Sequence, residues 1–168
     1  RWSLRAVKGF VAKISEDLTH AIGAVSIAYS QLDYALHAAI TSLAGLTEET
    51  GLAVTTHIAF PVKMGILRSL IDLKLEDGEV RTELLALVDR AADGNARRNG
   101  IIHDSWAVRN DGAEFRVATK ARGKLSMTST EATAAAVLAD ATFIRSTSLD
   151  LIDFLRDSGL ARRAAQTP

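Results

Sequence analysis

The sequence predicts a mainly helical bundle of four to five helices, with a small antiparallel β-hairpin inserted before the last helix. Two observations predict this fold. Apolar residues recur at alternating spacings of four and three along several long segments, which places them on one face of a helix. Ahead of the last such segment the spacing changes to two, which is typical of strands. We find no linker or repeat, so residues 1–168 are predicted to form a single domain.

The composition narrows the class of protein. The chain has 168 residues, a formal net charge of zero and no cysteine. Neutrality argues against a general polyanion binder, and the lack of cysteine excludes disulfides and thiolate metal sites. No apolar run approaches the roughly 20 residues that a membrane helix needs. We therefore expect a cytoplasmic protein without a membrane segment.

Three helices are predicted in the first half of the chain, after a short leading helix over residues 1–10. The first long helix begins near Ser15, which can cap it, and ends near Gly45. Thr47 is expected to cap a short second helix, and Pro61 suits the first turn of a third helix that runs to about residue 75. The apolar face of the first long helix carries Leu18, Ile22, Val25, Tyr29, Leu32, Leu36, Ala39 and Leu43.

The central helix is predicted from residue 80 to about residue 103. The alternating residues that follow predict two or three strands over about 105–128, with turns near residues 110–112 and 121–124. Thr128, Ser129, Thr130 and Glu131 have the spacing of a capping box and are predicted to open the last helix, which ends near Gly159. Residues from about 160 to 168 are expected to form a frayed tail.

The residues most suited to chemistry lie at the end of the central helix. Its apolar face turns polar at Asn95 and Arg98, and Asn99 and His103 flank that face four residues apart. A polar group on a buried helix face costs several kcal/mol unless it is paired. Arg98 and His103 lie about 140° apart around the helix, but a long arginine side chain can still reach what the histidine touches.

The segment Arg98-Asn99-Gly100-Ile101-Ile102-His103 resembles the signature of the HEPN superfamily. In that signature an arginine and a following polar residue precede, by roughly four to six residues, a histidine near a helix end. The first long helix resembles the family's pairing helix, which often places an acidic residue opposite the signature, and Asp33 matches that residue. The resemblance implies a helical homodimer that brings two signatures into one cleft.

The resemblance also implies a metal-independent endoribonuclease, in a defence or toxin–antitoxin setting, with no cofactor and no metal. RNA supplies its own 2′-hydroxyl nucleophile, so His103 would transfer protons and Arg98 would hold the phosphate. Asn99 would orient the histidine or bind phosphate, and Asp33 would fix the tautomer of His103 or pair with Arg98. Asn95, Arg97, Tyr29 and Arg109 are the candidates for substrate contact, and an antitoxin or another protein is a candidate partner.

Each of these assignments has a structural alternative. The helix dipole alone explains a histidine in the last turn, and Arg98 could pair with Asp33 without any substrate. The whole chain would then be a non-catalytic homodimer that binds a protein or a nucleic acid. Tyr29, Asp33 and His37 form a row that could hold an ion, although such a row is more often the border of a packed helix. The basic residues of the hairpin could contact RNA or form an ordinary outer face.

Overall fold

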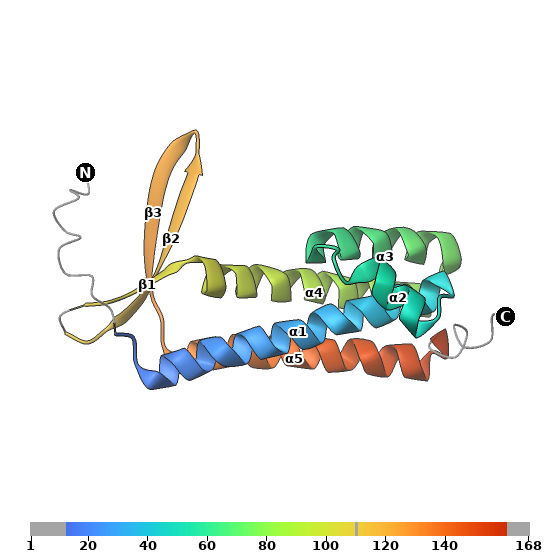
Figure 1. The fold of residues 1–168 in the computed structure, drawn as a ribbon, viewed down its shortest axis with the longest axis horizontal. Helices are drawn as coiled ribbons and strands as arrows, with labels where there is room; N and C mark the ends of the chain where they lie inside the picture. Colours follow the sequence, from blue (N-terminus) through green and yellow to red (C-terminus); the bar gives the residue numbers. More distant parts are fainter. Residues whose placement is uncertain (1–12, 110, 161–168) are drawn as a thin grey trace.

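Five helices and one antiparallel sheet make up the part of the chain that the computed structural model describes, residues 13–109 and 111–160 (Figure 1). In chain order they are α1 (Glu16–Ala44), α2 (Glu48–Thr55), α3 (Phe60–Lys74), α4 (Glu79–His103), β1 (Ser105–Val108), β2 (Glu114–Arg122), β3 (Lys124–Glu131) and α5 (Ala134–Asp157). The prediction of a mainly helical fold with a sheet before the last helix is confirmed. The predicted leading helix over residues 1–10 lies outside the described residues.

Side-chain caps explain where three of the helices begin. Ser15, Thr47 and Thr133 each accept a hydrogen bond from a backbone N–H of the first turn of α1, α2 and α5. Such caps satisfy donors that have no partner inside the helix. Gly45 ends α1 in the left-handed conformation, with φ of 68°, which glycine adopts without strain. The predicted boundaries of α1 and the cap of α2 are therefore confirmed.

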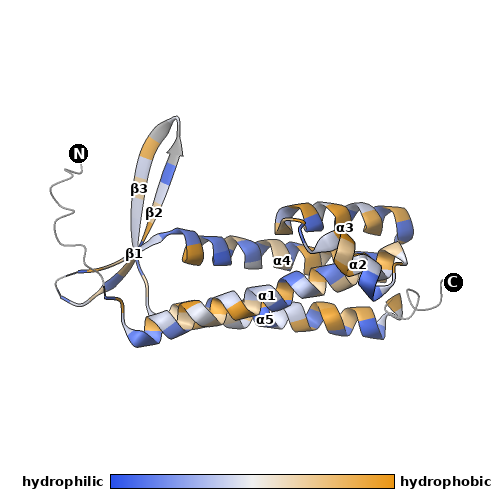
Figure 2. Ribbon diagram, in the orientation of Figure 1, coloured by the Kyte–Doolittle hydropathy of each residue, from blue (hydrophilic) through white to orange (hydrophobic). Residues whose placement is uncertain are grey.

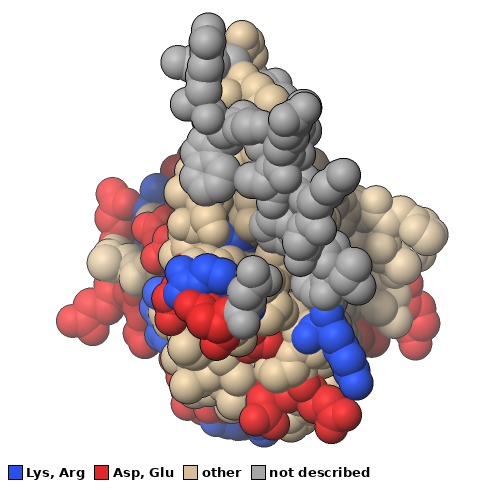
Figure 3. Space-filling model, turned by 90° about the vertical axis from the view of Figure 1, so that its left-hand side faces the viewer, with Lys and Arg blue, Asp and Glu red and all other residues tan. Residues whose placement is uncertain are grey.

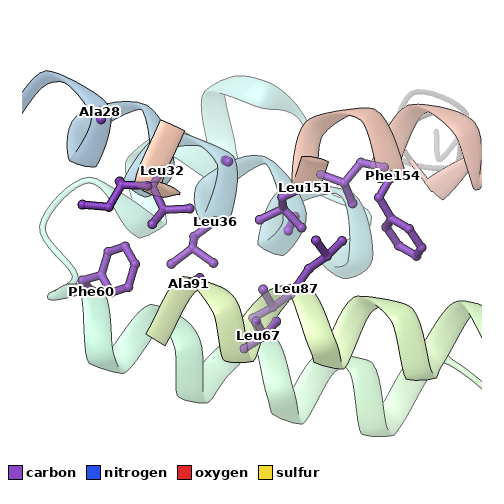
Figure 4. Close-up of a cluster of buried hydrophobic side chains, with 14 of the residues drawn as sticks. Ala28, Leu32, Leu36, Phe60, Leu67, Leu87, Ala91, Leu151 and Phe154 are labelled. Carbon is purple, nitrogen blue, oxygen red and sulfur yellow. The ribbon is translucent and has the colours of Figure 1, made fainter. Parts of the chain in front are cut away.

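The core lies between α1, α3, α4 and α5. In Figure 1, α1 and α5 lie side by side and run in the same direction, and α4 returns in the opposite direction. Hydrophobic residues recur along these helices between hydrophilic ones (Figure 2), and the close-up shows Leu32, Leu36, Ala91 and Leu151 pointing toward one another (Figure 4). All four are buried. The predicted apolar face of α1 therefore forms part of the core.

Small residues on α4 let it approach its neighbours closely. A methyl group added at Gly94 would lie 3.1 Å from Leu32 Cδ2 and 3.5 Å from Ile144 Cγ1. The backbone of α4 at this point therefore contacts side chains of both α1 and α5. This close approach holds the second half of α4 against α1, where the candidate residues lie.

The sheet extends farther than predicted. Its order is β1-β2-β3, with both pairs antiparallel. β1 pairs with β2 only as far as Ser105 and Val117, and beyond that point β2 and β3 continue as a two-stranded ribbon that stands away from the helices (Figure 1). At its base the ribbon is held to α1, because Glu114 Oε1 accepts a hydrogen bond of 2.6 Å from the Ser15 N–H.

Two predictions about the end of the chain are wrong. Thr128 to Glu131 do not open the last helix but pair with residues 115–118 of β2, and the helix cap is Thr133. The capping-box spacing competed there with the strand preference of threonine and with a long pairing partner. Leu160, the first residue of the predicted frayed tail, is instead buried in the core. Residues 161–168 lie outside the described part.

No helix among residues 13–109 and 111–160 combines the length and the apolar character that crossing a membrane requires.

Candidate active site

Arg98, Asn99 and His103 converge at the end of α4. One guanidinium nitrogen of Arg98, Nη1, lies 3.0 Å from His103 Nε2 and donates a 3.0 Å hydrogen bond to Asn99 Oδ1. Because a guanidinium has donors only, His103 Nε2 is the acceptor, and the neutral imidazole carries its proton on Nδ1. His103 is exposed, whereas Arg98 and Asn99 are half-buried. The sequence placed these groups on different sides of the helix, and the length of the arginine brings them together.

Tyr29 of α1 supports the arginine from below. The Arg98 guanidinium lies over the Tyr29 ring, 4.7 Å from its centroid, and Tyr29 donates a 2.9 Å hydrogen bond to Asn95 Oδ1. A cation over an aromatic ring is attracted by the ring quadrupole. Burial raises the pKa of the Tyr29 phenol, and this outweighs Arg98, which lowers it; Asp33 adds a smaller upward effect. The phenol therefore stays protonated near neutral pH and can keep donating to Asn95.

The sheet holds the end of α4 in place. The Trp106 indole of β1 donates a 2.9 Å hydrogen bond to the Ile101 carbonyl, which would otherwise lack a partner at the helix end. Arg116 of β2 lies against Gly100, where an added methyl would come within 2.9 Å of Nη1, and its Nε pairs with Asp104 at 3.3 Å. Gly100 therefore makes room for an arginine that ties the strand to the helix carrying His103.

One face of α4 is open to solvent from Asp89 onward and carries small side chains toward the helix end. α3 lies along the first half of α4, where Arg68 binds Asp89. Spacings of three and four carry that same face from Asp89 to Ala92, Ala96, Asn99 and His103. In Figure 1 α3 extends along α4 only to about its middle, and Ala96 and His103, beyond that point, are exposed. The candidate pair therefore borders a helix face with small side chains.

Contrary to the prediction, Asp33 lies outside the cluster of Arg98, Asn99 and His103. Its carboxylate pairs with Lys63 of α3, with 2.7 Å between Oδ2 and Nζ. The Lys63 side chain is only 3% exposed, so Asp33 is its charge partner at the edge of the core. No bond from Asp33 to Arg98 or His103 is present among the described contacts. Sequence reasoning missed Lys63, although its spacing from Phe60, Leu67 and Ile71 matches the buried face of α3.

Arg97 and Arg109 also lie away from the cluster. Arg97 turns toward α5, where it pairs with Asp140 at 2.6 Å and stacks on the Phe143 ring. Arg109 closes the turn between β1 and β2 by binding Asp111. Of the four candidates for substrate contact, the structure therefore brings only Tyr29 and Asn95 to Arg98.

The surface around this end of the molecule carries charges of both signs. Figure 3 shows Lys and Arg side chains next to Asp and Glu side chains at the end from which α1 starts.

Within residues 13–109 and 111–160, no three His, Asp or Glu side chains come together as metal ligands. In the Tyr29, Asp33 and His37 row, the buried His37 bonds Thr55 through Nδ1 at 2.7 Å, and Asp33 binds Lys63.

Comparison of the chain with protein-family models, with curated proteins and with solved structures gives no match.

Proposed function

We propose that the chain is a metal-independent endoribonuclease of HEPN type that acts as a homodimer. The observation that carries the proposal is the contact between Arg98 and an exposed His103. Metal-free RNA cleavage needs a cation at the phosphate, a proton acceptor and a proton donor, and Arg98 and His103, 3.0 Å apart, can supply the first two. Tyr29 and Asn95 serve to hold Arg98 in position.

The resting contact suggests how the two groups would be used. A phosphate that binds the Arg98 guanidinium takes over Nη1 and releases the lone pair of His103 Nε2. Nε2 then accepts the proton of the 2′-hydroxyl while the 2′-oxygen forms its bond to phosphorus. The bond from phosphorus to the 5′-oxygen breaks, and that oxygen takes up a proton. The products are a 2′,3′-cyclic phosphate and a 5′-hydroxyl.

A second copy would complete the site. One histidine that has accepted the 2′-hydroxyl proton cannot at the same moment donate to the leaving oxygen, so a second donor is needed. The uncovered face of α4, with Ala92, Ala96 and Asn99, is narrow enough for another helix to approach. A two-fold contact there would bring His103 of a second copy near the first. The antitoxin or defence setting stays a prediction of the resemblance.

The test is cleavage of cellular RNA in the presence of EDTA by the wild type and by His103→Ala. General acid–base groups contribute about 10²- to 10⁴-fold, so we expect at least a 100-fold loss of rate. His57→Ala is the matched control, because His57 is exposed in the connection between α2 and α3. Termini of the products are identified by whether they accept phosphate from polynucleotide kinase without prior treatment.

Two results would decide against catalysis. Cleavage that persists in His103→Ala assigns the nuclease to a contaminant or to another site. A folded, dimeric wild type that cleaves no RNA points instead to the non-catalytic homodimer, in which Arg98 and Tyr29 only stabilise α4 against α1. Arg98→Lys distinguishes phosphate binding by Arg98 from its role in stabilising α4 against α1, because lysine keeps the charge but loses the bidentate geometry.

A further inference from the structure

The ribbon of β2 and β3 projects beyond the rest of the sheet. After the last pair with β1 at Val117, five residue pairs remain, from Ala118 and Thr128 to Arg122 and Lys124. At about 3.4 Å per residue, this part is about 17 Å long. No element of the described chain covers it in Figure 1. A two-stranded ribbon alone gains little stability in water, so the stability of the fold does not explain this extension.

The charge of this ribbon differs from that of the chain. Residues 116–130 contain Arg116, Lys120, Arg122 and Lys124 and no acidic residue. The chain as a whole is neutral, so the balancing negative charge lies elsewhere. Lys120 is exposed. The ribbon therefore carries an excess of positive charge, although the net charge of the whole chain is zero.

The ribbon starts next to the candidate site. β1 begins at Ser105, two residues after His103, and Arg116 at the base of the ribbon contacts both Gly100 and Asp104 of α4. A polyanion held at Arg98 and His103 would therefore meet positive charge along the adjoining ribbon. Residues 116–130 contain no aromatic side chain, so the ribbon lacks the stacking platform that binds individual bases.

We propose that the ribbon formed by residues 118–128 is a second binding site for RNA, which contacts the phosphate backbone of a single strand next to the site at Arg98 and His103. Its contribution is electrostatic and independent of base sequence. This inference rests on the proposed function only in taking RNA as the polyanion. The rival is self-association through the apolar side chains Leu125 and Met127, which are 67% and 57% exposed.

The experiment measures binding without cleavage. Full-length His103→Ala protein is titrated against a fluorescently labelled single-stranded oligouridylate, and anisotropy gives the affinity at several salt concentrations. The test variant adds Lys120→Ser, Arg122→Ser and Lys124→Ser. The matched control instead adds Leu125→Ser and Met127→Ser, which change the same ribbon without changing its charge. Circular dichroism and thermal melting establish that both variants are folded.

Counterion release predicts the size of the effect. Each phosphate neutralised on a single strand contributes about −0.7 to the slope of log affinity against log salt, so loss of three contacts makes the slope shallower by about 2. Raising salt from about 50 to about 200 mM then costs the parent about 20-fold more affinity than the charge variant. The Leu125 and Met127 control is expected to keep the slope of the parent.

Three outcomes would overturn the inference. The charge variant could keep the slope of its parent, which removes the ribbon from the RNA contact. Both variants could weaken binding equally, which indicates a general effect on the fold. The control could also change the sedimentation coefficient while the charge variant binds RNA normally, which makes the ribbon a self-association surface. If the wild type cleaves no RNA, the proposed function fails, but the binding comparison still decides the role of the ribbon.

Discussion

Asp33→Asn tests whether Asp33 belongs to the core or to the candidate site. In the structure its carboxylate, 38% exposed, is the ion-pair partner of Lys63, whose side chain is 3% exposed. The change keeps the shape of the side chain and removes its charge. Lys63 is then left as a buried cation without a counter-charge, because it lies between α3 and α1 and cannot turn outward without disrupting their packing.

The expected loss of stability follows from the difference in burial between Lys63 and Asp33. Breaking a fully buried ion pair by removing one partner costs about 3–5 kcal/mol. Water already screens Asp33, so the figure is discounted to about 2–3 kcal/mol. For a chain of this size, that loss lowers the melting temperature by about 5–10 °C. Lys63→Met removes the buried charge and leaves Asp33 free to hydrate, so it is expected to cost less than about 1.5 kcal/mol.

Thermal and urea unfolding of the two single variants and of the double variant at neutral pH measures these values. We expect Asp33→Asn to be the least stable of the three and the double variant to recover most of the loss. The double variant is also expected to cleave RNA like the wild type, since neither residue contacts Arg98 or His103. If Asp33→Asn is as stable as the wild type but abolishes cleavage, Asp33 acts in the site and the structural assignment is refuted.

Two further predictions concern the phenol at the site and the packing of helices. In Tyr34→Phe, Tyr29 is the sole tyrosine, and ultraviolet titration should give a pKa above the ordinary value of about 10, because burial disfavours the phenolate. Because the pKa of Tyr29 is raised in the folded state, its contribution to stability is complete below about pH 10 and is lost as the pH rises through the raised pKa. Tyr29→Phe should remove this pH-dependent loss of stability. A measured pKa at or below 10 would contradict the burial of the phenol. Gly51→Ala forces a methyl group against the Thr41 hydroxyl and should destabilise the protein by about 1–3 kcal/mol, whereas Gly65→Ala meets no atom within 4 Å and should stabilise α3 by about 0.5–1 kcal/mol. Equal melting temperatures for these two glycine variants would show that α2 does not pack on α1 at that point.

The helices could be predicted because their signals are repeated many times along the chain. Each apolar face offers several residues at helical spacing, and Ser15 and Gly45 mark the ends of α1 by local chemistry. The predicted start of α5 is wrong because it depends on a single four-residue motif, whereas the helix cap is Thr133. Thr128 to Glu131 satisfy the capping-box pattern as well as the strand pattern, and only the pairing with β2 decides between them.

The candidate site could be predicted in part. The convergence of Arg98 and His103 depends on side-chain length, which the sequence contains, and the structure brings them to 3.0 Å. The partner of Asp33 depends on where α3 crosses α1, which helical spacing does not contain. Lys63 fills that position, so the acidic residue that matched the resemblance is already bound within one protomer.

Two polar contacts join the root of the ribbon to two different helices. Glu114 binds Ser15 at the amino end of α1. Two residues later in β2, Arg116 pairs with Asp104 at the carboxyl end of α4. Two nearby positions of the same strand therefore hold the root of the ribbon to two different helices. Grafting the ribbon onto another scaffold would therefore require both contacts, with Ser15 and with Asp104, to be transferred with it.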